Sequence, residues 1–159
     1  MCLFNTYMGK TGGKMTAKEY LYSIREDDIK IKLRLKEVDK LKDLIKSVGA
    51  VKYTDGKVQN TTNIDAPFMK TLEKIDEETV RIDKMIEKLV DKKRQATEVI
   101  HTLKNKTQSD VLYKKYIDYK SLGEIAKDMH YSYSYVCHVH GFALLEFGQN
   151  FKYVKNIEV

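Results

Sequence analysis

The chain has 159 residues, of which 33% are charged, with a single proline and a formal net charge of +6. This length suits one ordinary domain or a small domain with a long helical extension, and the composition indicates a helix-rich fold. No run of about eighteen apolar residues occurs, which excludes a membrane-spanning helix and predicts no membrane partner. The basic excess favours a polyanionic partner.

The first fourteen residues read as a flexible N-terminal segment. They lack the basic start and apolar middle of a secretory signal, and a second methionine, Met15, leaves open whether residues 1–14 are native. The two cysteines, Cys2 and Cys137, show no metal or disulfide pattern, as is usual in a reducing compartment. We therefore expect a cytoplasmic protein.

Residues 15–106 are predicted to form two long helices. The first runs from Thr16 to about Ser47, with Thr16 and Glu19 spaced as a capping box and Gly49 ending the helix. Its apolar side chains recur every three or four residues, which is the pattern of a helix that packs along one seam. The seam positions are Leu21, Ile24, Ile31, Leu35, Val38 and Ile45.

The second long helix is predicted from Asp65 or Pro67 to Leu103, after a polar loop over residues 52–67. Two such helices most simply fold back as a long antiparallel, coiled-coil-like hairpin over residues 15–106. The alternative is that each helix pairs with a second copy and gives a homodimer. The seam positions are Leu72, Ile75, Thr79, Ile82, Ile86, Leu89, Lys93, Ala96, Ile100 and Leu103.

Residues 121–147 carry the pattern of a helix-turn-helix. Ser121 and Glu124 have the spacing of a capping box, and Ser132 is placed to cap the second helix. The turn falls at His130-Tyr131, where the backbone usually needs a positive φ. Ala126 is the small residue expected where the helices cross, and Val136 and Val139 return apolar side chains to that crossing. The apolar faces of the two helices are Leu122, Ile125, Ala126 and Met129 on the first and Val136, Val139, Ala143, Leu144 and Phe147 on the second.

A further helix from about Ser109 to Asp118 would support this motif. The predicted fold class is therefore all-α, a long helical hairpin followed by a small helix-turn-helix domain. We assign residues 107–147 to that domain and residues 148–159 to a C-terminal tail.

The segment from Ser109 to Phe147 resembles the fourth region of bacterial sigma factors. The matching residues are Val111-Leu112, Tyr116, Leu122-Gly123-Glu124-Ile125-Ala126, Ser132, Val136 and Ala143-Leu144. With the sequence from Met15 to Leu21, the whole chain resembles the small sigma-like transcription regulators of phages and prophages in Gram-positive bacteria. This resemblance implies double-stranded promoter DNA and RNA polymerase as partners.

The same resemblance implies which side chains face DNA. Phosphate-facing positions correspond to Lys120 and Ser121, with Ser132 at the start of the recognition helix. Base-facing positions correspond to Tyr133, Ser134, Cys137 and His138. Sigma factors usually carry Arg and Gln at several of these places, and this helix has no Lys or Arg at all from Ser132 to Phe147, which predicts weak DNA affinity by the helix alone.

The sequence offers no catalytic or metal-binding pattern. The sequence has no Ser-His-Asp order and no phosphate-binding loop, and no second cluster of metal ligands could complete a site with Cys137 and His140. We therefore expect no enzyme activity, no metal and no cofactor. The predicted function is a DNA-binding transcription regulator that recruits RNA polymerase. The alternatives are a DNA-recognition subunit for phage DNA packaging, resembling a small terminase subunit, and a coiled-coil interaction protein.

Overall fold

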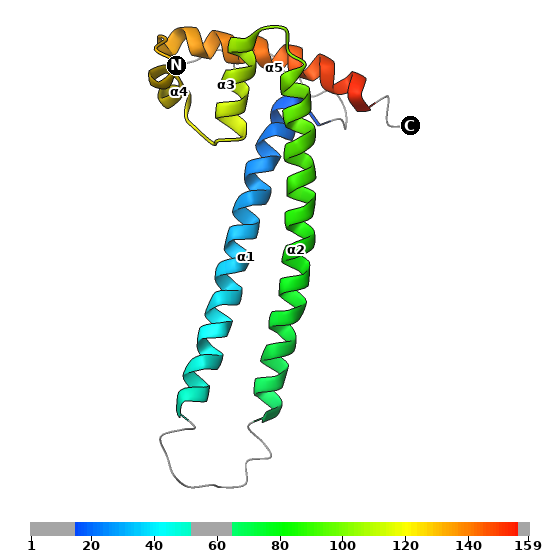
Figure 1. The fold of residues 1–159 in the computed structure, drawn as a ribbon, viewed down its shortest axis with the longest axis vertical. Coiled ribbons are helices and arrows are strands. Elements are labelled where there is room, and N and C mark those ends of the chain that lie inside the picture. The colour runs from blue at the N-terminus through cyan, green and yellow to red at the C-terminus, as the bar shows by residue number, and fades with distance from the viewer. Residues whose placement is uncertain (1–14, 52–64, 156–159) are drawn as a thin grey trace. The chain divides into compact units, whose positions relative to one another are not determined.

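The structure is a computed structural model that describes residues 15–51 and 65–155. The described residues form helices and no strands, so the all-α prediction is confirmed (Figure 1). The predicted flexible segment 1–14, most of the predicted loop and residues 156–159 lie outside the described residues. The helices are α1 (Ala17–Val51), α2 (Asp65–His101), α3 (Lys106–Tyr116), α4 (Leu122–Asp128) and α5 (Tyr133–Lys155).

The predicted helix boundaries hold to within a few residues at most ends, and α5 is the exception. Thr16 and Glu19 form the predicted capping box, because Thr16 N–H donates to the Glu19 carboxylate at 2.8 Å and Glu19 N–H donates to Thr16 Oγ1 at 3.2 Å. Helix α1 continues past Gly49 to Val51. Helix α5 was expected to end at Phe147, but it continues to Lys155, so most of the predicted C-terminal tail is helical.

The chain divides into two compact units. Unit 1 comprises Met1–Glu26 and Leu89–Val159, and unit 2 comprises Asp27–Lys88. Both long helices therefore contribute to both units, and the division does not follow the predicted boundary at residue 106. In unit 1, Tyr20 from the first turns of α1 and Thr102 just after α2 both contact α5.

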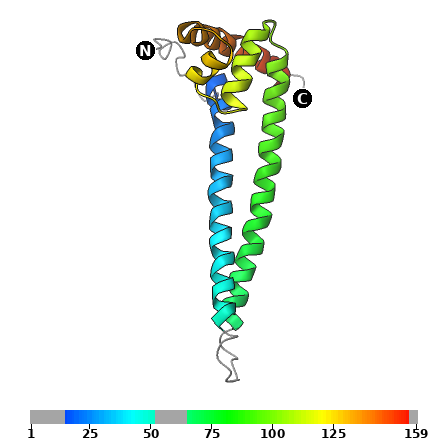
Figure 2. The same cartoon turned by 60° about the vertical axis from the view of Figure 1, so that its left-hand side comes forward.

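In unit 1, α5 lies close to the start of α1 (Figure 2), and aromatic rings pack between the two helices. The side chain of Phe147 is fully buried, and its ring lies 6.5 Å from the ring of Tyr20 and 5.6 Å from that of Phe151. The Tyr20 and Phe151 rings are 4.4 Å apart. The packing of Phe151 against Tyr20 and Phe147 stabilises the continuation of α5 beyond Gly148.

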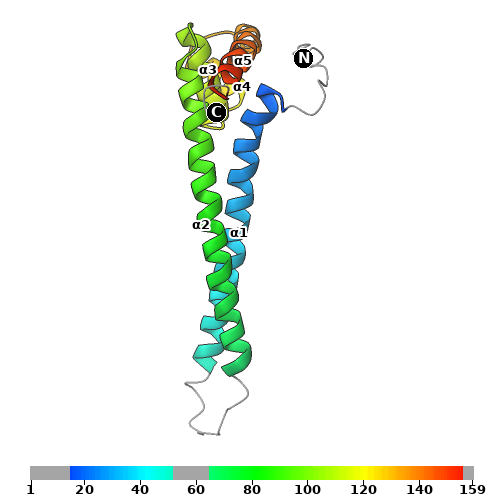
Figure 3. The same cartoon turned by 90° about the vertical axis from the view of Figure 1, so that its right-hand side faces the viewer.

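In unit 2, α1 and α2 bury one apolar position in each seven-residue repeat. The buried side chains are Ile31 and Val38 from α1 and Ile75 and Ile82 from α2. Across the same interface, Arg34 donates to the Glu78 carboxylate at 2.8 Å. The two segments lie side by side in Figures 1 and 3.

The second seam position of each repeat is not covered. Leu35 is 41% exposed and Ile86 is 38% exposed, so the prediction that both belong to a buried seam is wrong. The physical reason is that each helix has one neighbour in this unit, which covers only a narrow stripe, and the flanking positions stay open to solvent.

Candidate nucleic-acid interface

Helix α4 is held at its start by a reciprocal cap. The Ser121 hydroxyl accepts a hydrogen bond from the Glu124 N–H at 3.2 Å, and the Glu124 carboxylate accepts the Ser121 N–H at 2.7 Å. Both hydrogen bonds were predicted from the sequence, and both are confirmed. They satisfy two backbone donors that a seven-residue helix would otherwise leave unpaired.

A tight reversal of the backbone ends α4. The Tyr131 N–H donates to the Ala126 carbonyl at 2.9 Å, and the His130 N–H donates to the Lys127 carbonyl at 3.3 Å. This is the pattern of a Schellman motif, whose middle residue takes a left-handed conformation. His130 has φ of 57°, as the sequence predicted for this position.

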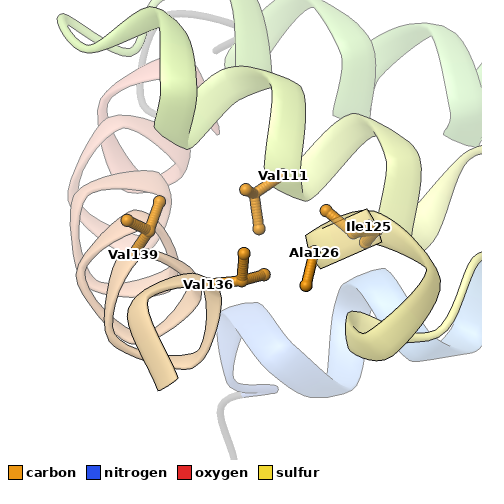
Figure 4. Packing of buried hydrophobic residues seen from close by; sticks show 5 residues of the cluster. All are labelled: Val111, Ile125, Ala126, Val136 and Val139. Atoms are coloured by element: carbon orange, nitrogen blue, oxygen red, sulfur yellow. The ribbon is translucent and has the colours of Figure 1, made fainter. Parts of the chain in front are cut away.

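The side chains at the crossing of α3, α4 and α5 form one apolar cluster (Figure 4). Ala126 is 6% exposed and Val136 is fully buried, so the small residue and the branched residue predicted at this crossing do meet in the core. Val111 contributes to the same cluster from α3. The complete cluster is Val111, Ile125, Ala126, Val136 and Val139, with Leu122 and Met129 partly buried against it.

The first half of α5 presents uncharged polar and aromatic side chains to solvent. Ser132 caps the helix, since its hydroxyl accepts the Tyr135 N–H at 3.2 Å. Tyr133 is 53% exposed, and Ser134 and His138 are also exposed. The His138 ring is oriented by its Nδ1, which lies 2.8 Å from the Ser134 carbonyl oxygen.

Cys137 does not share this outward orientation. Its side chain is buried, with 8% exposed, so the prediction that it faces bases is wrong. The helical spacing explains the error, because Cys137 lies next to Val136 and on the side that turns towards the core. The structure also records Cys137 as disulfide-bonded, contrary to the expectation of unpaired thiols. Cys2, the other cysteine, lies outside the described residues, and the cysteine argument for a cytoplasmic location is removed.

Lys120, predicted to face phosphate, is engaged within the protein. It forms an ion pair with Asp128 at the end of α4, and Lys114 Nζ lies 3.8 Å from the same carboxylate. The hydrogen bond from Lys120 lowers the pKa of Asp128, and that bond together with the Asp128 charge raises the pKa of Lys120. Part of the positive charge expected at this end of the motif is therefore neutralised.

A pair formed by the buried Tyr116 and the half-buried His140 was not predicted from the sequence. Tyr116 Oη and His140 Nε2 lie 3.0 Å apart, and the two rings stack with centroids 5.8 Å apart. Burial lowers the pKa of His140 to about 4, with the charges of Lys115 and Lys18 adding to the effect. The sequence does contain a signal for this pair. His140 lies four residues after Val136 and three before Ala143, so helical spacing places it on the same inward face.

Comparisons with known proteins add no assignment: no family model matches the sequence, no curated protein matches it, and no solved structure matches the fold. No group of three or more metal-ligating side chains comes together in residues 15–51 and 65–155. None of the helices described here is long and apolar enough to span a membrane.

Proposed function

We propose that the chain is a DNA-binding transcription regulator that uses α4 and α5 as a helix-turn-helix on double-stranded promoter DNA. In this proposal α5 is the recognition helix, and α1 and α2 form an antiparallel hairpin that contacts RNA polymerase. The polymerase part rests on the resemblance of the sequence to sigma-like regulators of phages and prophages. No catalytic role is proposed, and the cytoplasm is proposed as the site of action because bacterial promoter DNA and RNA polymerase lie there.

One observation supports this proposal above the others. The short, capped α4 is joined to α5 by a reversal that buries Ala126 against Val136, and this packing leaves one face of the N-terminal half of α5 exposed. A helix presented in this way can enter the major groove of DNA. Tyr133, Ser134 and His138 are the exposed side chains there, and each can form hydrogen bonds with base edges or phosphates.

The experiment is a gel shift with the full chain and the DNA that flanks its gene, at low salt and with competitor DNA. The variant Tyr133→Ala with His138→Ala is expected to lose the discrete shift while its circular dichroism stays unchanged. The matched control is Tyr113→Ala with His101→Ala, which removes the same two side-chain types from exposed positions on α3 and α2. Equal binding by both double variants would remove α5 from the DNA interface.

A second candidate, a protein-interaction module, is favoured by exposed apolar residues further along α5. Phe142 is 57% exposed and Leu145 is 50% exposed, and Tyr135, at 46%, lies about two and three turns before them on the same face. Oligomeric state by light scattering separates the candidates. A monomer or dimer that shifts DNA fits the regulator, a ring of many copies fits DNA packaging, and an oligomer without DNA binding fits the interaction module.

A further inference from the structure

Tyr119, which lies between α3 and α4 and directly precedes Lys120, is an unfavourable residue in two respects. Its φ is 61°, a left-handed conformation that is unusual for a bulky side chain. Its buried Oη has no hydrogen-bond partner in the part of the chain that the structure describes. Each feature costs free energy, and such costs tend to collect at functional sites.

Positive charges gather around the Tyr119 ring. The guanidinium carbon of Arg25, from α1, lies 5.9 Å from the ring centroid, and Nζ of Lys93, from α2, lies 5.1 Å from it. Lys115, from α3, completes the group: burial lowers its pKa, and the charge of Arg25 lowers it further. We call Arg25, Lys93, Lys115 and Tyr119 the Tyr119 cluster.

The cluster is not neutralised from within the described protein. Among residues 15–51 and 65–155, none of its three cations forms an ion pair. Glu124 acts favourably on Lys115 through its charge, and its carboxylate also accepts the Ser121 N–H at 2.7 Å. Cations held together on three helices, none of them in an ion pair among the described residues, favour the binding of an anion.

The position of the cluster in the chain selects the kind of anion. Tyr119 is followed directly by Lys120 and Ser121, the two residues predicted to face phosphate, and Lys120 is engaged by Asp128. Helix α5 has no Lys or Arg from Tyr133 to Phe147. A DNA reader draws much of its affinity from phosphate neutralisation, so cations outside α5 have to supply it.

We propose that the Tyr119 cluster binds backbone phosphates of duplex DNA and supplies the sequence-independent part of the affinity. This inference rests on the proposed function and identifies the cations that supply the positive charge that α5 lacks. The aromatic ring holds the two cations of α1 and α2 in place through cation–π contacts. In this way the long helices contribute directly to the DNA interface.

The first test measures binding of the full chain to a short duplex of mixed sequence over a series of salt concentrations. In Arg25→Gln with Lys93→Gln, we expect the slope of log K against log salt to fall by about 2, and affinity at low salt to fall about tenfold or more. The control Arg81→Gln with Lys84→Gln loses the same charge from α2 within unit 2 and should keep the wild-type slope. The charge-preserving exchange Arg25→Lys with Lys93→Arg should also keep it.

A second test needs no DNA. Pyrophosphate is compared with sodium chloride at equal ionic strength, and the melting temperature of each variant is recorded. Pyrophosphate should raise the melting temperature of the wild type and the control, but not that of Arg25→Gln with Lys93→Gln, because a ligand stabilises only a fold that binds it.

The outcomes separate the two proposals. Unchanged salt slopes together with equal pyrophosphate effects in all variants would overturn the Tyr119 site while DNA binding by the wild type upholds the proposed function. A cluster-dependent pyrophosphate effect in a protein that binds no duplex would overturn the DNA function and leave an anion site. Absence of both effects in the wild type would overturn both.

Discussion

Tyr116 and His140 join α3 to α5 through a hydrogen bond of 3.0 Å between Oη and Nε2. Burial lowers the pKa of His140 from 6.5 to about 4, so the ring is neutral in the folded protein at pH 7. In the unfolded chain the same ring takes up a proton near pH 6.5. The pair therefore connects the packing of α5 to pH.

The first prediction concerns acid stability. A folded pKa below the unfolded value means that the contribution of His140 is complete above pH 6.5 and is lost as the pH falls towards 4. Between pH 7 and pH 4.5, the wild type should lose about 2 kcal/mol more unfolding free energy than His140→Gln, which cannot titrate. Urea unfolding at both pH values measures this, and parallel losses in the two proteins would contradict it.

The second prediction compares two isoleucines one helical turn apart in unit 2. Ile82 is 2% exposed and Ile86 is 38% exposed. Truncation of a buried isoleucine leaves a cavity, so Ile82→Ala should cost about 2 to 4 kcal/mol, whereas Ile86→Ala should cost less than about 1 kcal/mol.

The same denaturant titration gives both values, and each variant is the control for the other. Equal costs would mean that both seam positions are buried in solution, as the sequence predicted, for example through pairing with a second copy. In that case the apparent unfolding free energy of the wild type should also rise with protein concentration.

These two isoleucines illustrate what the sequence could predict and what it could not. Periodicity identifies which residues lie on one face of a helix, and Ile82 and Ile86 both satisfy it. The number of neighbours that cover the face is a tertiary property, and a single neighbour covers only Ile82. The helix caps could be predicted from the sequence, because a cap such as Ser121 with Glu124 depends on residues within one turn of each other.

The Tyr119 cluster could not be predicted from the sequence, for a related reason. Arg25, Lys93 and Lys115 lie on three helices and are far apart in the sequence, so no local pattern brings them together. The side chains predicted from the sequence to face DNA all lie between Lys120 and His138, within the motif. Residues at the start of α1 and the end of α2 contribute to unit 1, and this brings two of those cations beside the motif.

The third prediction tests the cap of α4. Ser121→Ala removes the hydroxyl that accepts the Glu124 N–H and should cost about 1 kcal/mol of unfolding free energy. Ser134→Ala makes the same change at an exposed position inside α5, where alanine is the better helix former, and should be neutral or slightly stabilising. Thermal unfolding of both variants measures the difference, and a neutral Ser121→Ala would mean that the cap does not form in solution.

The fourth prediction concerns the reversal between α4 and α5. His130 has φ of 57°, which costs free energy for any residue with a Cβ atom, although histidine tolerates it better than most. His130→Gly should therefore stabilise the protein by about 0.5 to 1 kcal/mol, and His130→Val should destabilise it by about 1 kcal/mol or more, because branched residues fit this conformation worst.

In the control for this prediction, a glycine substitution should have the opposite effect on stability. His138 lies inside α5, where glycine is unfavourable, so His138→Gly should destabilise by about 1 kcal/mol. Urea unfolding of both variants in one buffer measures the difference. If His130→Gly and His138→Gly destabilise equally, residue 130 is helical in solution, α4 and α5 form one continuous helix, and the proposed recognition helix loses the reversal on which its exposure depends.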